Sequence, residues 1–148
     1  MAQTLKIAIQ SRSPYGIKTE HTTRRQVKFR TDEPPAAGGE GSGPSPLEAA
    51  LAALTGCLAV VVPLVAESMG FQHGALAFAA EGVFDRDGML GVPGVRRHFQ
   101  RVELDVAVET DEPQERLEQL ALQVEDRCPV HNLFTAAGVE MRSVWHRA

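Results

Sequence analysis

Two hydrophobic patterns alternate along the chain and together predict a protein of mixed α and β structure. Apolar and polar residues alternate over residues 4–10 and 99–109, as in strands with one buried face. Further strands are predicted over 17–29, 75–84 and 139–145. Residues 47–69 are instead apolar nearly all round, which is the pattern of a helix at the centre of a structure.

Turn and cap residues set the limits of these elements. A turn is predicted at Ser13–Gly16, and the Pro-, Gly- and Ser-rich residues 32–46 predict a loop of the length that is usually functional or disordered. The long helix should begin where Ser45 caps its first turn and Glu48 completes a capping box. It should end at Gly70.

In the second half, residues 85–88 predict a turn. A helix should follow Pro113, Cys128-Pro129 should interrupt it, and a short helical piece should continue to Ala137. The order β-β-α-β-β-α-β predicts an α+β fold with antiparallel sheet, in a single domain over residues 1–148. One such sheet can hardly cover so apolar a helix, so a second copy of the chain is the expected cover.

Composition and charge argue against a membrane protein, a secreted protein and a nucleic-acid-binding protein. The apolar stretch Leu47–Met69 contains Glu48, Pro63 and Glu67, which favours a buried helix over a membrane span. The first residues lack the long apolar region of a secretory signal, so we expect a soluble cytoplasmic protein. Residues 1–30 hold seven Lys and Arg against one acid, net +6, but no aromatic platform accompanies them. We therefore expect solvated strand faces, or pairing with an acidic partner surface, and no nucleic acid.

The two cysteines are the candidate reactive groups. Cys57 lies in the middle of the apolar helix, where a packed inert thiol and a reactive thiol are both open interpretations. Cys128 directly precedes Pro129, where its sulfur can face the amides of the next helical piece. Those amides should stabilise a thiolate and lower the pKa of Cys128.

His131 and Glu48 are weaker candidates. His131 follows Cys128 by three residues, but no clear fourth ligand accompanies the two cysteines and this histidine, so we expect no metal site. A Cys57–His131 pair for acyl transfer stays open as an alternative. Glu48 lies on the opposite side of the helix from Cys57, so the two side chains cannot touch along the helix. Glu48 could therefore act on Cys57 only by organising another group between them.

Four segments make the chain resemble the OsmC/Ohr family, in its OsmC-like branch. GPSPLEAALAALTGC, continued by LAVVVPLVAESMGF, looks like the family's helix start and central-helix cysteine, and RCPVHNLF looks like its second cysteine motif. DEPPAAGG and FDRDGMLG also resemble members of that branch.

The resemblance implies an intertwined homodimer, with antiparallel sheets wrapped around long central helices, and a thiol peroxidase activity. Cys57 would attack a hydroperoxide, Cys128 would resolve the sulfenic acid as a disulfide, and a dithiol or other thiol reductant would reset it. The family also uses an Arg held by Glu48, and Arg30 is the candidate nearest the loop. No cofactor is implied. The alternatives are a non-catalytic dimer that binds a small apolar ligand, and a cysteine-dependent acyl hydrolase.

Overall fold

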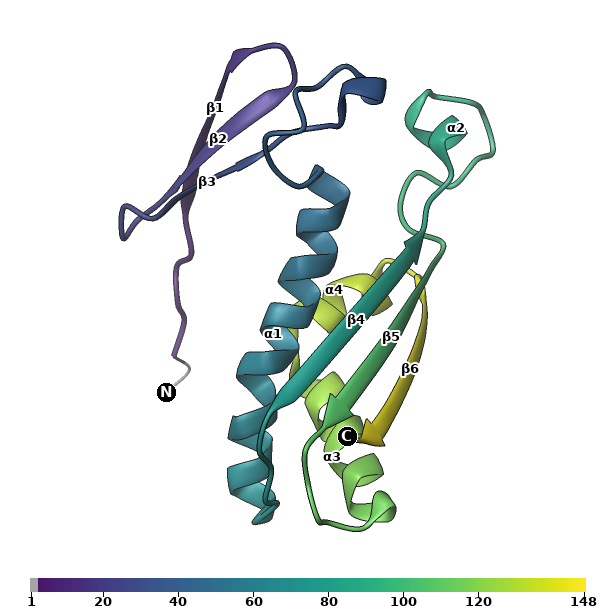
Figure 1. Ribbon diagram of the computed structural model, residues 1–148. Helices are drawn as coiled ribbons and strands as arrows, with labels where there is room; N and C mark the ends of the chain where they lie inside the picture. The colour runs from purple at the N-terminus through teal and green to yellow at the C-terminus, as the bar shows by residue number, and fades with distance from the viewer. Residues whose placement is uncertain (1–2) are drawn as a thin grey trace. The chain divides into compact units, whose positions relative to one another are not determined.

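The computed structural model describes residues 3–148 and has the α+β architecture that the sequence predicts. The chain divides into two compact units, residues 1–50 and 51–148, and each contains a three-stranded sheet (Figure 1). The single domain over residues 1–148 stays a prediction. The long helix α1 (Pro46–Met69) begins at the end of the first unit and continues through the second.

The first unit contains the antiparallel sheet β1-β2-β3, formed by β1 (Ile9–Tyr15), β2 (Lys18–Thr23) and β3 (Lys28–Thr31). The strand predicted over residues 4–10 is therefore wrong over most of its length. The first cross-strand pair is Ile9 with Thr23, where β2 ends. Residues 3–8 alternate in sequence but have no strand beside them in the described chain.

The strand predicted over residues 17–29 is also wrong, because it is split into β2 and β3 by a tight turn. Thr23 and Val27 close this turn with a main-chain hydrogen bond of 2.9 Å from the Thr23 N–H. Gln26 adopts a left-handed backbone, with φ of +64°. That geometry cannot continue an extended strand.

Both predicted ends of α1 are confirmed. Ser45 and Glu48 form the capping box: the Ser45 main-chain N–H donates to the Glu48 carboxylate at 2.7 Å, and the Glu48 N–H donates to Ser45 Oγ at 3.2 Å. At the other end Gly70 has a φ of +61°. The Gly70 and Phe71 N–H groups donate to the Glu67 and Ala66 carbonyls at 3.2 and 2.9 Å, which is a Schellman motif.

The second unit contains the sheet β4-β5-β6 and three shorter helices. Its elements after α1 are β4 (Leu76–Val83), α2 (Arg86–Met89), β5 (Arg101–Val108), α3 (Gln114–Arg127), α4 (Pro129–Ala136) and β6 (Glu140–Arg147). Where a turn was predicted over 85–88, Asp85 caps α2 by accepting a hydrogen bond from the Asp87 N–H at 3.0 Å.

The sheet of the second unit corrects the expectation of antiparallel pairing throughout. β4 and β5 are antiparallel, but β5 and β6 are parallel. The pairing of Arg101 with Glu140 shows the reason, because α3 and α4 return the chain to the beginning of β5 before β6 starts.

The core of the second unit joins this sheet to its helices. Alternate residues of β5 are buried, as the sequence pattern predicts, and so are apolar side chains on one side of α1 and of α3. The Val and Leu side chains of this core that are at most 2% exposed are Leu54, Leu58, Val62, Val65, Val102, Leu104, Val106, Val108, Leu117, Leu120 and Val124. Burying each Val or Leu stabilises the fold by about 1.5–3 kcal/mol.

One face of α1 is uncovered in the single chain. Val60 and Leu64 are 63% and 60% exposed, while Leu54 and Leu58 on the other face are fully buried. The helix has the length and hydropathy of a membrane span, yet its buried face forms the core of the second unit. It is therefore a core helix with an additional apolar face that lacks a partner in the single chain.

Candidate functional site

The structure makes the two cysteines neighbours within the second unit. Cys57 projects from the middle of α1 and is partly exposed, and Cys128 lies between α3 and α4 and is fully buried. Both thiols are free. They lie close enough that Cys57 raises the pKa of Cys128. Seventy-one residues of sequence separate these two sulfurs, so the fold has created the pair.

Cys128 occupies the N-cap position of α4, as its place before Pro129 predicts. Its Sγ accepts a hydrogen bond from the His131 main-chain N–H at 3.4 Å. The predicted direction of its pKa shift is nevertheless wrong. Burial raises the pKa of the Cys128 thiol above its ordinary value, and the amides of His131 and Val130 only partly oppose this. Cys128 therefore carries its proton at neutral pH.

The junction that holds Cys128 is fastened by Asn132, a residue that the sequence analysis did not single out. Its Nδ2 group donates to the main-chain oxygens of Glu125, Asp126 and Cys128 at 3.2, 2.8 and 2.9 Å. The Glu125 and Asp126 oxygens are carbonyls at the end of α3, which lack partners within that helix, and the Cys128 oxygen also accepts the Asn132 main-chain N–H at 3.0 Å. An Asn four residues after a Cys-Pro break is the signal that could have indicated this role.

His131 and Glu125 form a second polar pair at the same junction. The His131 ring is buried, and its Nε2 is shielded from solvent without a hydrogen-bond partner. Glu125 Oε2 lies 3.9 Å from that nitrogen. Glu125 Oε1 is fixed by the indole N–H of Trp145, 2.8 Å away. The structure thus links three elements, α3, α4 and β6, beside the buried thiol.

Glu48 and Arg30, the other predicted site residues, belong to the first unit. The hydrogen bonds from Ser45 lower the pKa of the Glu48 carboxyl, so Glu48 is ionised at neutral pH. Arg30 lies on exposed β3, and no ion pair joins it to Glu48 within the described residues. The structure therefore establishes the capping role of Glu48, and the role of Arg30 stays a prediction.

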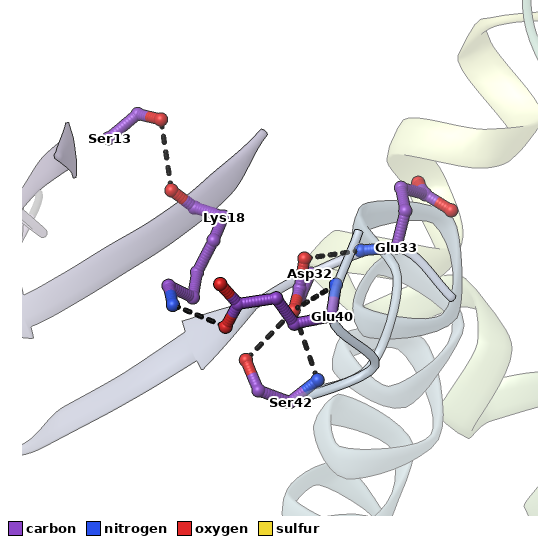
Figure 2. Close-up of polar contacts among 6 residues, drawn as sticks. All are labelled: Ser13, Lys18, Asp32, Glu33, Glu40 and Ser42. Carbon is purple, nitrogen blue, oxygen red and sulfur yellow. Dashed lines mark hydrogen bonds and ion pairs between the residues drawn. The ribbon is translucent and has the colours of Figure 1, made fainter. Parts of the chain in front are cut away.

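Asp32 organises the loop before α1 and was also missed by the sequence analysis. It is 1% exposed, and its carboxylate accepts hydrogen bonds from the Glu33, Glu40 and Ser42 N–H groups and from Ser42 Oγ, at 2.8–3.1 Å. Figure 2 shows the loop folded around it, with Glu40 in turn paired to Lys18 at 2.6 Å. These bonds, led by that from the Ser42 amide, lower the pKa of Asp32.

Four open hollows in the described part of the chain are lined by neither Cys57 nor Cys128. An open hollow of about 700 Å³ lies on the polar face of the β1-β2-β3 sheet, among Arg12, Lys28 and Arg30. In residues 3–148, no three His, Cys, Asp or Glu side chains gather closely enough to hold a metal ion. The thiol pair with its polar neighbours is accordingly the arrangement with the clearest chemistry.

Comparison with known proteins gives a consistent result. The family model described as OsmC-like protein matches residues 39–143. No curated protein matches the chain. Among solved structures, an OsmC-like protein from Mycoplasma pneumoniae superposes with a TM-score of 0.86 at 16% identity, over 99% of both chains.

Two further solved structures have names that refer to peroxides. An organic hydroperoxide resistance protein OsmC from Legionella pneumophila covers 97% of this chain and 98% of its own, with a TM-score of 0.75 and 17% identity. An organic hydroperoxide resistance protein from Elizabethkingia anophelis covers 100% of both chains, with a TM-score of 0.74 and 18% identity. At these identities the likeness shows a shared fold.

Proposed function

Because the chain belongs to the OsmC-like protein family, we propose that it is a thiol peroxidase that reduces organic hydroperoxides through Cys57 and Cys128. The observation that carries the proposal is the pair of free neighbouring thiols in the second unit. A role connected with peroxides agrees with the family and with the names of the solved relatives.

The proposed reaction has two thiol steps. The sulfur of Cys57 attacks the terminal oxygen of the hydroperoxide, the O–O bond breaks, and the alcohol leaves with one proton. Cys57 is then a sulfenic acid. Cys128 attacks this sulfur, a disulfide forms and water leaves. A dithiol or other thiol reductant restores both thiols by exchange.

The assignment of the two roles rests on exposure. Cys57 is the partly exposed thiol, so an incoming peroxide can reach its sulfur. Cys128 is fully buried and protonated, which suits a thiol that reacts only with its neighbour. A resolving thiol hidden from solvent is also protected from direct oxidation by peroxide.

An apolar stripe supports organic hydroperoxides as the better substrates, with hydrogen peroxide the poorer one. Val60 and Leu64 follow Cys57 by three and seven residues on α1, which places all three on one side of the helix. Both apolar side chains are largely exposed in the single chain. In the homodimer proposed below, where a second copy covers this face, the stripe would give an alkyl or aryl group an apolar lining next to the reactive sulfur.

The remaining parts of the proposal concern the partner and the activating charge. We propose a cytoplasmic homodimer in which the uncovered face of α1 is buried against a second copy. We also propose that Arg30, held by the ionised Glu48, stabilises the Cys57 thiolate. A second candidate function, binding of a small apolar ligand without catalysis, is favoured only by the same exposed stripe.

Thiol counting after oxidation tests the proposal. The reduced protein is treated with one equivalent of cumene hydroperoxide, beside the Cys57→Ser and Cys128→Ser variants. We expect rapid loss of both thiols in the natural sequence and no reaction of Cys57→Ser. Cys128→Ser should stop at a sulfenic acid that dimedone traps. Thiols that survive for minutes in the natural sequence would contradict the peroxidase and favour the ligand-binding alternative.

A further inference from the structure

The β1-β2-β3 sheet belongs to a strongly basic part of a chain that is acidic as a whole. Residues 1–30 carry a net charge of +6, while the whole chain carries −4. A local excess of one sign attracts binding partners of the opposite sign. The effect is largest where the cations gather on one surface.

The strand register gathers three of these cations on one face of the sheet. Residues that pair directly across neighbouring strands project to the same side, and alternate residues of one strand do so as well. Two neighbouring rows of residues therefore share this face. Across the sheet the rows are Arg12–Glu20–Arg30 and Gln10–Thr22–Lys28.

This face forms the floor and walls of the open hollow of about 700 Å³. Thr22, on the central strand, has a short side chain, whereas Arg12 and Lys28 on the outer strands have long ones. The two outer strands lie about 10 Å apart, which separates the cationic walls by the width of the central strand. The hollow has the volume of a ligand site.

Most of the positive charge in the hollow is available to a partner. Arg12 Nε lies 3.3 Å from Glu20 Oε2, and an exposed ion pair of this kind is weak. Within residues 3–148 no ion pair engages Lys28 or Arg30, and both residues are exposed. Glu20 is the one acid among the residues that line the hollow, so three cations outweigh it.

The spacing of the cations favours an extended polypeptide as the occupant. Lys28 and Arg30 are alternate residues of one strand, so about 7 Å separates their Cα atoms. Acidic side chains at alternate positions of an extended peptide have the same spacing. A single compact anion at the centre of the face would instead meet the Glu20 carboxylate.

A nucleic acid fits this face less well. Single-stranded nucleic acids bind to aromatic side chains on which their bases stack. Phe29 is the one aromatic residue of the lining, and it is already stacked on His21, with ring centroids 4.7 Å apart.

We propose that the polar face of the β1-β2-β3 sheet binds an extended acidic segment of a partner protein, whose alternate acidic side chains pair with Arg12, Lys28 and Arg30. This interaction goes beyond the proposed function and does not depend on the thiols. Lys and Arg stay charged at physiological pH, so the binding should depend strongly on salt and little on pH between 6 and 9.

Binding is tested on the full-length protein with a labelled ten-residue peptide of alternating Glu and Thr, followed by fluorescence anisotropy at low salt. Arg12→Gln combined with Lys28→Gln removes two charges from the face, and Arg30 is left unchanged because the proposed function assigns it to Cys57. Arg24→Gln combined with Arg25→Gln is the matched control. It removes two exposed charges from the turn after β2, outside the hollow.

We expect the Arg12 and Lys28 double variant to bind the peptide roughly tenfold more weakly, since two ion pairs are lost. The control should lose less than about twofold, because its charges act only at a distance. Glu20→Gln should bind about threefold more tightly, a gain that a damaged fold would not produce.

Three results would overturn the inference. They are equal losses in the two double variants, no binding of the acidic peptide at low salt, and tighter binding of a ten-nucleotide single-stranded DNA than of the peptide. Disulfide formation with cumene hydroperoxide should proceed at the natural rate in both double variants. Failure of the docking surface would thus leave the proposed function standing, and failure of the peroxidase would leave the docking surface standing.

Discussion

The side-chain amide of Asn132 donates a hydrogen bond to the main-chain oxygen of Cys128, 2.9 Å away. Because the same amide also holds the Glu125 and Asp126 carbonyls, one side chain fixes the break between α3 and α4. The position of the Cys128 sulfur opposite α1 depends on the geometry of this break. Asn132 is therefore a positioning residue for the thiol pair.

We expect Asn132→Ala to lower the free energy of unfolding by about 1 kcal/mol, since it leaves helix-terminal carbonyls to solvent. Disulfide formation after one equivalent of hydroperoxide should slow as well, because Cys128 is no longer held in one place. Urea unfolding and thiol counting measure the two effects. Leu133→Ala, at an exposed neighbour on the same helix, is the control and should change stability by less than about 0.5 kcal/mol.

A second prediction concerns the loop around Asp32. In the natural protein one carboxylate oxygen of Asp32 accepts the Glu40 and Ser42 N–H groups. Asp32→Asn replaces one of the two carboxylate oxygens by an NH₂ group, which cannot accept, and removes the negative charge. Amide hydrogen exchange at Glu40 and Ser42 should become about tenfold faster, while exchange in β5 stays unchanged. Equal exchange in the variant and the natural protein would show that the loop does not depend on this carboxylate.

The pH dependence of this loop follows from the lowered pKa of Asp32. A carboxyl whose pKa is lower in the folded protein contributes stability above its unfolded value of about 3.8, and that stability is lost as the pH falls through the folded value. Protection of the loop should thus be constant from pH 5 to 8 and disappear only below about pH 3.8.

The sequence predicts the local elements better than their partners. The capping box at Ser45 and the Gly70 end of α1 are local hydrogen-bond patterns, so sequence spacing alone identifies them. The parallel pairing of β5 with β6 depends instead on how α3 and α4 return the chain. The apolar alternation of residues 4–8 indicates a strand, but strand formation requires a neighbour that these residues lack in the single chain.

In the candidate site too, the sequence predicts local features better than the contacts that depend on the fold. The two cysteine motifs identify the thiols, but only the fold reveals that burial outweighs the α4 amides at Cys128. The sequence likewise does not predict that Glu125 lies near His131, because this distance depends on how α3 packs against α4. Asp32 was overlooked because a carboxylate in a Gly-rich loop usually faces solvent.

The uncovered face of α1 predicts the oligomeric state. Val60→Glu places a charge in the centre of that face, where burial against a second copy would be strongly disfavoured. We expect the natural protein to be a dimer at micromolar concentration and Val60→Glu to be a monomer, as measured by light scattering after size exclusion. Val144→Glu is the control, because Val144 is 60% exposed on the outer side of β6 and should leave the dimer intact. A natural protein that is monomeric would contradict the prediction.

The last prediction separates the two roles of Glu48. Gln at this position can still accept the hydrogen bond from the Ser45 N–H, so Glu48→Gln should keep the capping box and leave thermal stability nearly unchanged. It removes the negative charge that would hold Arg30 beside the Cys57 thiolate. If that charge matters, the rate of sulfenic acid formation should fall roughly tenfold in Glu48→Gln and in Arg30→Gln, and the double variant should be no slower than either single variant. Ser45→Ala is the opposite control: it should cost about 1 kcal/mol of stability without slowing the reaction of the folded protein. A natural rate in Glu48→Gln would restrict Glu48 to capping, and a natural rate in Arg30→Gln would assign the activating charge to another residue.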